Sequence, residues 1–148
     1  MTDKYFDELK SELQKGAAEK DHPYRYFSLA TVGVDHMVRQ RILVLRKANE
    51  DLLLTFFTDY RSKKIMHIRE NKRVSLLFYD AINLIQIRID GLASIDKDEE
   101  TIKSHWREVK GSARRVYTRT TAPGSAIEAP ELIEYLHEDN YFCAVNVT

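Results

Sequence analysis

The sequence has few of the residues that break up or cross-link a chain: five glycines, three prolines and one cysteine in 148 residues. So little glycine and proline excludes collagen-like and low-complexity sequence. The single cysteine, Cys143, cannot form an internal disulfide. Residues 1–13 lack the charged and then apolar pattern of a secretory leader, so we expect a cytoplasmic protein.

Net charge and long apolar runs are also missing. The 23 Lys and Arg residues balance the 23 Asp and Glu residues. With no extended basic stripe either, this argues against nucleic acid as the partner. The most apolar stretch, residues 52–57, is far shorter than the ~18 residues that a membrane span needs, so no membrane partner is expected.

Several common catalytic patterns are absent. The five histidines are scattered without metal-ligand spacing, so no metal site is expected. There is no glycine-rich phosphate loop and no Gly-x-Ser-x-Gly turn around a nucleophile. The sequence therefore disfavours covalent hydrolase chemistry.

The residues that are present predict one domain over 1–148. Hydrophobic residues make up 43% of the chain, which is ordinary for a globular domain of this length. Apolar residues at three- and four-residue spacing predict an N-terminal helix over 3–19. We expect a barrel over about 24–95, a helical segment over about 98–137 and a last strand over 141–147.

Aromatic and β-branched residues predict the barrel strands. Residues 37–46 and 52–58 are expected to pair as one hairpin, and 74–79 and 82–95 as a second. In the second hairpin Ile85, Ile87 and Ile89 share one face. Strands that arrive as hairpins with few helices between them favour a mainly β fold, an antiparallel sheet curled into a barrel with flanking helices.

The block at residues 58–64 is the most informative stretch for function. Ser62 is a good N-cap for a short helix, and three cations, Arg61, Lys63 and Lys64, stand at its start. The helix dipole disfavours positive charge there, and an anion would resolve the conflict. Exposed backbone N–H groups, the Thr58 and Ser62 hydroxyls and the two lysines would form a phosphate cradle. The alternative is a solvated basic surface.

Other polar side chains lie on the expected strands. Arg41 and Arg46 flank a strand that otherwise reads as buried, and arginine suits a bidentate contact to phosphate. The alternative is that both side chains extend to water. Gln86 and Arg88 lie opposite the isoleucine face, where polar side chains are more often solvent-exposed.

Taken in order, five segments resemble the pyridoxamine 5'-phosphate oxidase-related family, the FMN-binding split barrels. They are Tyr-Arg-Tyr-Phe-Ser-Leu-Ala-Thr-Val at 24–32, Arg-Ile-Leu-Val-Leu-Arg at 41–46, Phe-Phe-Thr-Asp-Tyr-Arg-Ser-Lys-Lys at 56–64, Val-Ser-Leu-Leu-Phe-Tyr at 74–79 and Gln-Ile-Arg-Ile-Asp-Gly at 86–91. The resemblance covers roughly 24–95 and rests on the order and spacing of the segments.

The resemblance implies a six-stranded antiparallel split barrel that forms a homodimer, with FMN at the subunit interface. The family's phosphate-binding residues would be Arg41, Arg46, Ser62, Lys63 and Lys64, and its flavin-contacting residues would be Phe57, Thr58 and Gln86. The implied function is an FMN-binding oxidoreductase that transfers a hydride between a small-molecule substrate and flavin. The protein mainly orients and polarises the ring in such enzymes, and the resemblance assigns no catalytic acid or base.

Two departures from the family pattern bear on the substrate. Where the oxidases of pyridoxamine phosphate grip the substrate with Tyr, Arg and Ser, residues 106–115 read Trp-Arg-Glu-Val-Lys-Gly-Ser-Ala-Arg-Arg. The family's strand with a Trp and an Arg near the flavin has no counterpart after 141–147, so we expect a pocket that is either more open or completed differently. The alternatives are a non-catalytic flavin- or haem-binding split barrel, or a barrel that binds nucleic acid or protein.

Overall fold

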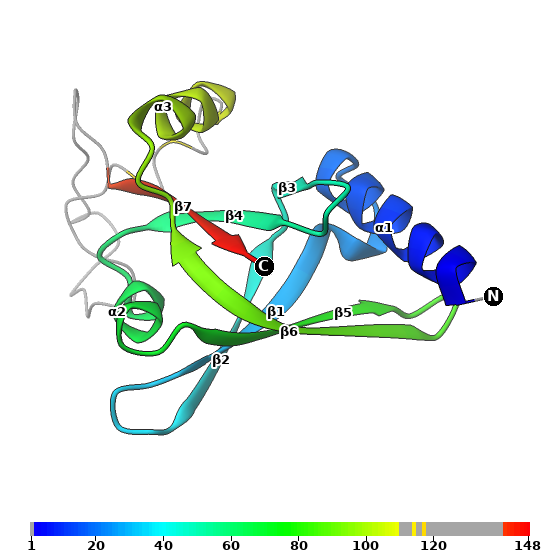
Figure 1. Cartoon of the computed structure of the whole chain (residues 1–148), viewed down its shortest axis with the longest axis horizontal. Helices are drawn as coiled ribbons and strands as arrows, with labels where there is room; N and C mark the ends of the chain where they lie inside the picture. Colours follow the sequence, from blue (N-terminus) through cyan, green and yellow to red (C-terminus); the bar gives the residue numbers. More distant parts are fainter. Residues whose placement is uncertain (1, 110–113, 115–116, 118–140) are drawn as a thin grey trace, which may run out of the picture.

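The computed structural model describes residues 2–109, 114, 117 and 141–148. Seven strands in this part of the chain form one antiparallel sheet, in the order β2-β1-β5-β6-β7-β4-β3, that curves into a half-barrel (Figure 1). The strands are β1 (Tyr26–Val32), β2 (Val38–Val44), β3 (Lys47–Ala48), β4 (Leu54–Asp59), β5 (Arg73–Asp80), β6 (Ile85–Ile95) and β7 (Phe142–Val147).

The expectation of six strands is therefore wrong, because the described residues alone form seven. The additional strand, β3, has only two residues, which pair with Leu54 and Thr55 of β4. A two-residue strand is too short for an alternating pattern to appear in the sequence.

The first predicted hairpin is wrong in its pairing. β2 pairs along its whole length with β1, from Val44 opposite Tyr26 to Val38 opposite Val32. A tight turn closes this pair, in which the Gly33 N–H donates to the Met37 carbonyl at 2.8 Å. β4 pairs instead with the short strand β3, which was expected to be part of a loop, and with β7.

The second predicted hairpin forms as expected. β5 and β6 pair from Arg73 opposite Leu92 to Asp80 opposite Ile85. Along β6, Ile87 is buried and Ile89 half-buried, whereas Ile85 beside the turn is 48% exposed. The isoleucine face thus covers the core except at the end of the hairpin.

The helical segments that flank the sheet include α1 (Thr2–Ala18), the 3₁₀ turn η1 (Pro23–Arg25), α2 (Lys63–Glu70) and α3 (Glu99–Glu108). α1 lies beside β3. α2 lies at the end of the β5–β6 hairpin that is farther from the turn between its two strands (Figure 1). The helical pattern predicted beyond α3, including a short helix near 130–137, falls largely outside the described residues. No helix in the described part of the chain is long and apolar enough to cross a membrane.

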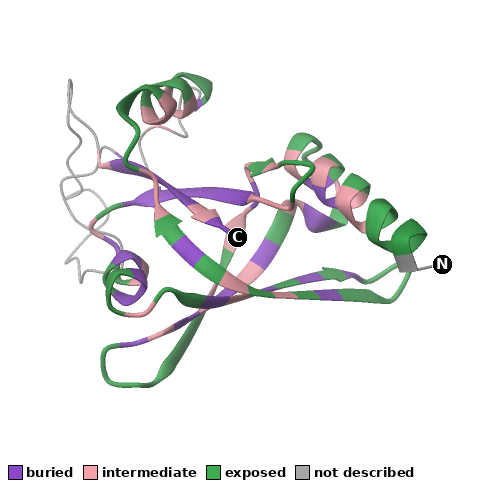
Figure 2. Cartoon of the chain, in the orientation of Figure 1, coloured by how far each residue is buried: buried purple, intermediate pink, exposed green. Residues whose placement is uncertain are grey.

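Two hydrophobic clusters lie on opposite faces of β4. The main cluster fills the half-barrel, and Phe27, Phe56 and Phe78 are its largest members. The second contains Phe57, Phe142 and Tyr117, with Trp106 of α3 packed against it. Figure 2 shows β4 as buried along its length. Because successive side chains of a strand point to opposite faces, Phe57 and Thr58 are separated by the sheet.

Candidate anion-binding site at the start of helix α2

The side chains of Thr58, Ser62 and Lys64 meet where β4 ends and α2 begins. The Lys64 ammonium donates to Thr58 Oγ1 at 2.9 Å, and Ser62 Oγ lies 3.4 Å from the same oxygen. Ser62 is the N-cap residue of α2 with extended backbone, but its side chain makes no capping hydrogen bond. The three side chains therefore gather beside a helix start whose first N–H groups lack a side-chain cap.

Lys64 is a half-buried cation without a carboxylate partner in any ion pair of the described residues. Burial, and secondarily the nearby charge of Arg41, lowers the pKa of the Lys64 ammonium to about 8. Burying a charge without a partner costs free energy. The site would therefore be stabilised by an anion.

Arg41 brings a second positive charge toward this site from β2. It is half-buried, and burial lowers the pKa of its guanidinium. Its Nη1 donates to Thr31 Oγ1 at 2.7 Å and more weakly to the Leu29 carbonyl at 3.4 Å. Thr31 Oγ1 in turn lies 2.9 Å from Nδ1 of His67 on α2. Strands β1 and β2 are thus linked to the helix that carries Lys64.

Arg61 differs from the other cations of the basic block because the chain itself supplies its counter-ion. Its Nη2 lies 2.6 Å from Oδ2 of the buried Asp59, and this hydrogen bond raises the pKa of the Arg61 guanidinium. The guanidinium also lies 3.4 Å from the ring centre of Tyr141. Asp59 was not predicted as the partner of Arg61, although the two residues are only two positions apart. Lys63, by contrast, is exposed.

Arg46 and Phe57 lie together on the other face of β4. The Arg46 guanidinium is 5.7 Å from the centre of the Phe57 ring, which packs against Phe142 at 4.9 Å. A hollow of about 250 Å³ beside them is also lined by Arg25 and Lys47. Within one chain the structure does not bring Arg46 and Phe57 together with the side chains around Lys64.

Gln86 lies near neither group. It is exposed at the start of β6, opposite Tyr79 and beside the β5–β6 turn. That turn and helix α2 lie at opposite ends of the hairpin (Figure 1). One chain alone therefore does not place Gln86 beside Lys64.

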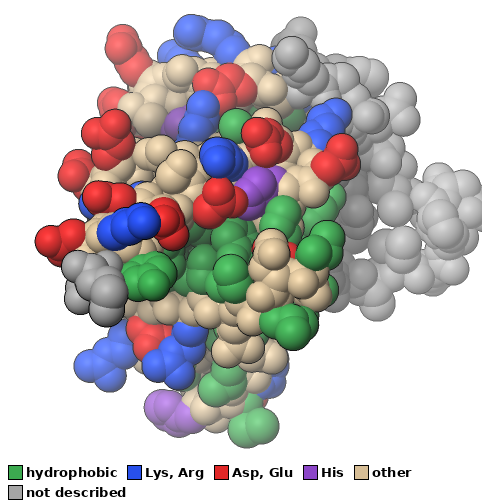
Figure 3. Space-filling model, turned by 90° about the vertical axis from the view of Figure 1, so that its right-hand side faces the viewer, with side chains coloured by type: hydrophobic (Ala, Val, Ile, Leu, Met, Phe, Trp, Pro, Cys, Tyr) green, Lys and Arg blue, Asp and Glu red, His purple; other side chains and the backbone are tan. Residues whose placement is uncertain are grey.

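The strands β2, β1, β5 and β6 present a common outer face. We define it by the cross-strand row Ile42, Ser28, Leu77 and Arg88. Large hydrophobic residues are exposed on it: Tyr26, Ile42, Leu77, Tyr79 and Leu92. Figure 3 gives a side view, in which hydrophobic side chains gather across the middle of the molecule with most charged side chains above them.

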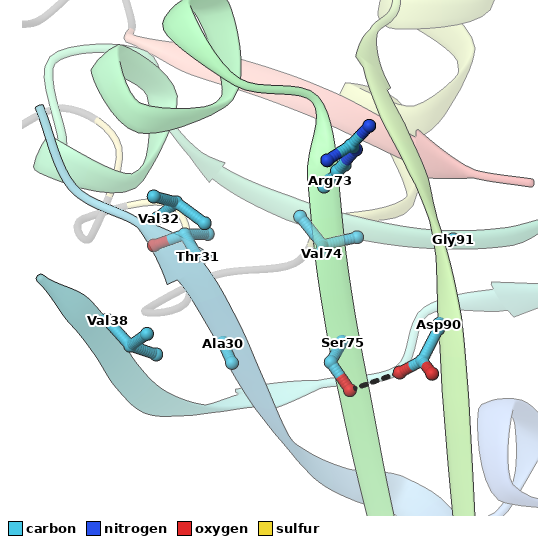
Figure 4. Close-up of a pocket in the computed structure, with 9 residues that line it drawn as sticks. All are labelled: Ala30, Thr31, Val32, Val38, Arg73, Val74, Ser75, Asp90 and Gly91. Atoms are coloured by element: carbon cyan, nitrogen blue, oxygen red, sulfur yellow. Dashed lines mark hydrogen bonds between the residues drawn. The ribbon is translucent and has the colours of Figure 1, made fainter. Parts of the chain in front are cut away.

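A hollow of about 360 Å³ opens between these four strands (Figure 4). It is lined partly by small residues, Ala30, Ser75 and Gly91. Ser75 donates to Asp90 at 2.7 Å on its border. An exposed apolar face with such a hollow is typical of an interaction surface.

Two further features limit the chemistry of the described residues. Cys143, the cross-strand partner of Thr58, is buried, and burial raises the pKa of its thiol to about 12. It is therefore an uncharged core residue at neutral pH. No group of three His, Cys, Asp or Glu side chains that could hold a metal ion occurs in the described part of the chain.

The family model for the FMN-binding domain of pyridoxamine 5'-phosphate oxidase matches residues 3–97. The chain belongs to this family. It is 33% identical over 108 residues to pyridoxine/pyridoxamine 5'-phosphate oxidase of Cupriavidus metallidurans, covering 70% of this chain and 50% of that protein. To the Psychrobacter cryohalolentis protein of the same name it is 38% identical over 96 residues, covering 64% and 44%. The chain thus spans about half the length of these curated relatives.

A solved structure supports the same fold. The pyridoxamine 5'-phosphate oxidase-related, FMN-binding protein of Nostoc punctiforme superposes with a TM-score of 0.73 at 24% identity, covering 95% of this chain and 77% of that one. The curved antiparallel sheet with its flanking helices is therefore the split-barrel-like fold of this family.

Proposed function

We propose that the protein is an FMN-binding oxidoreductase-like protein. In this proposal the flavin phosphate lies among Arg41, Thr58, Ser62, Lys63 and Lys64. The observation that carries it is the Lys64 ammonium, which is largely removed from water and forms no ion pair in the described part of the chain. A phosphate would offset that burial through charge-assisted hydrogen bonds.

The arrangement suits a phosphate monoester. Two lysines, an arginine and two hydroxyls come from three different elements, and the start of α2 adds backbone N–H groups with a favourable dipole. The residues present therefore fit FMN, and membership of an FMN-binding family supports this choice of anion.

The flavin supplies hydride transfer when it is bound. The role of the protein is to hold the phosphate and to orient the flavin ring. Phe57 and Arg46 lie across β4 from Lys64, so we propose that they meet a different part of the ligand from the phosphate. The substrate is proposed to be a small molecule other than pyridoxamine 5'-phosphate, because the sequence lacks the family's substrate-gripping pattern.

The proposal includes a homodimer formed through the outer face. A two-fold interface is self-complementary, so each copy would use the same patch of Ile42, Leu77 and Tyr79. Gln86 lies on this face at the end of the hairpin away from α2. A second copy would bring its own Gln86 toward the flavin, which one chain cannot do.

The visible absorption spectrum tests this proposal. The purified protein is mixed with FMN, freed of unbound flavin on a desalting column and scanned, and we expect it to retain flavin. Lys64→Met should retain much less, whereas the control Lys103→Met, on the exposed surface of α3, should match the wild type. A folded wild-type protein that retains no flavin would contradict the proposal, and a haem spectrum would favour the non-catalytic alternative.

A further inference from the structure

Thr31 and His67 are buried polar side chains that are not among the residues proposed to contact the phosphate. Their exposed fractions are 1% and 7%. They form a chain of hydrogen bonds with Arg41: its Nη1 is 2.7 Å from Thr31 Oγ1, which is 2.9 Å from His67 Nδ1. The chain therefore runs from β2 through β1 to α2.

The chemistry of the three groups fixes the direction of these bonds. A guanidinium can only donate, so the Thr31 oxygen accepts from Arg41. The Thr31 hydroxyl proton is then free to donate to Nδ1 of His67, provided that this nitrogen carries no proton. Burial and the charges of Arg41 and Arg39 lower the pKa of His67, which favours the neutral imidazole.

The other charged groups near His67 agree with this assignment. Arg41 and Arg39 of β2 and Lys63 of α2 all lower the pKa of His67. Asp35, in the β1–β2 turn, raises it, but this carboxylate pairs with Arg39 at 2.8 Å. His67 is therefore set among cations and serves as a neutral acceptor.

Only one nitrogen of the Arg41 guanidinium makes these hydrogen bonds. In the described residues, every hydrogen bond from its side chain leaves from Nη1: to Thr31, to the Leu29 carbonyl and to the Arg39 carbonyl. Nε and Nη2 donate to no residue that the structure describes. A guanidinium whose plane is fixed through one nitrogen keeps the others available for a bidentate contact to an anion.

We propose that Thr31 and His67 are positioning residues that aim the free side of Arg41 at the ligand phosphate. They would thereby set the preference of the site for FMN over riboflavin, which lacks the phosphate. This inference rests on the proposed function. His67 is well placed for the role because it follows Lys63 by one helical turn, so the helix that carries the lysines also fixes the arginine.

The test compares dissociation constants for FMN and riboflavin, measured by flavin fluorescence in the full-length protein. Thr31→Val removes the hydroxyl at nearly constant shape and should weaken FMN binding about tenfold while leaving riboflavin within about twofold. Thr31→Ser keeps the hydroxyl and should behave as the wild type. A loss of general stability would instead weaken both ligands.

A second pair of variants covers the case in which Thr31→Val does not fold. His67→Asn keeps an acceptor near the position of Nδ1 and should preserve the preference for FMN. His67→Leu removes the acceptor and should reduce the preference in the same way as Thr31→Val. Thermal unfolding without ligand establishes which variants are folded.

The outcomes separate this inference from the proposed function. If the wild type binds FMN but the hydroxyl-free and acceptor-free variants keep its preference for FMN over riboflavin, the positioning role is wrong and flavin binding stands. If the wild type does not bind FMN, the proposed function fails. The positioning role is then tested with inorganic phosphate, which should raise the unfolding temperature of the wild type and Thr31→Ser clearly more than that of Thr31→Val. No such difference would overturn it.

Discussion

The Lys64 ammonium donates to the hydroxyl of Thr58, 2.9 Å away, where a carboxylate would be the usual partner of a buried lysine. A hydroxyl dipole offsets only part of the cost of removing a charge from water. This relationship ties together the stability of the protein without ligand and its affinity for an anion, because the same charge lowers the first and raises the second.

Lys64→Met should therefore move the two properties in opposite directions. We expect the free energy of unfolding of the ligand-free protein at pH 7 to rise by about 1–3 kcal/mol, because a buried charge is replaced by an apolar side chain of similar length. FMN affinity should fall at least about tenfold. Urea unfolding and fluorescence titration measure the two effects. A less stable variant with unchanged FMN affinity would show that Lys64 has a purely structural role.

FMN binding should weaken as pH rises above 8. The folded protein holds the Lys64 proton with a pKa of about 8, below the ordinary 10.5, and phosphate binding requires the protonated form. Affinity should thus change little between about pH 7 and 8, where the phosphate is doubly charged and Lys64 is protonated, and fall by up to about tenfold per pH unit above that. Riboflavin affinity should not follow this curve. A profile for Lys64→Met as steep as that of the wild type would assign the titration to another group.

The stability of the ligand-free protein should change in the opposite sense over the same range. A lysine whose folded pKa is depressed destabilises the fold while it is charged in both states. The cost is present below pH 8 and is relieved as pH rises from 8 to 10.5, so wild type and Lys64→Met should converge in stability there. Urea unfolding at several pH values checks this, and a constant difference between the two proteins would contradict it.

Leu77→Glu should convert the proposed dimer to a monomer. Leu77 lies in the central row of the outer face and is 38% exposed in the single chain. Burying a carboxylate at an apolar interface is costly. The control is Met66→Glu on α2, because Met66 is also exposed but lies outside that face. Light scattering at saturating FMN measures the mass, and a wild-type monomer would refute the shared site.

Ile87→Ala should lower the free energy of unfolding by about 2–5 kcal/mol, because Ile87 is buried on the inner face of β6 and its loss leaves a cavity. Ile85→Ala is the matched control, since Ile85 is exposed at the end of the same strand. Its effect should be much smaller. Equal losses in urea unfolding would mean that both isoleucines are buried in solution.

Local patterns in the sequence were sufficient to predict the positions of every described strand except the two-residue β3, the β5–β6 hairpin and the helix that starts after Ser62. They did not predict which strand pairs with β2. The residues of β2 are compatible with pairing to β1 or to β4. The tight turn between Gly33 and Met37 places β2 against β1. Pairing between strands depends on such turns more than on composition.

The sequence predicted only the part of the site whose residues lie close together along the chain. The basic block at 58–64 indicated an anion, and the structure brings Thr58, Ser62 and Lys64 together there. The pairing of Arg61 with Asp59 and the link from Arg41 through Thr31 to His67 depend on side-chain geometry. The sequence signal for the pair was the two-residue spacing of Asp59 and Arg61, and the signal for the link was the position of His67, one helical turn after Lys63. Gln86 could not be placed because its position relative to Lys64 depends on a second copy.

Equilibrium titration of the purified wild-type protein with FMN, followed by the quenching of flavin fluorescence, tests the central claim most directly. The account predicts saturable binding at micromolar FMN or below, and weaker binding of riboflavin because Lys64 and Arg41 then lack their phosphate. No quenching by a folded protein at micromolar flavin, or equal affinity for FMN and riboflavin, would contradict it.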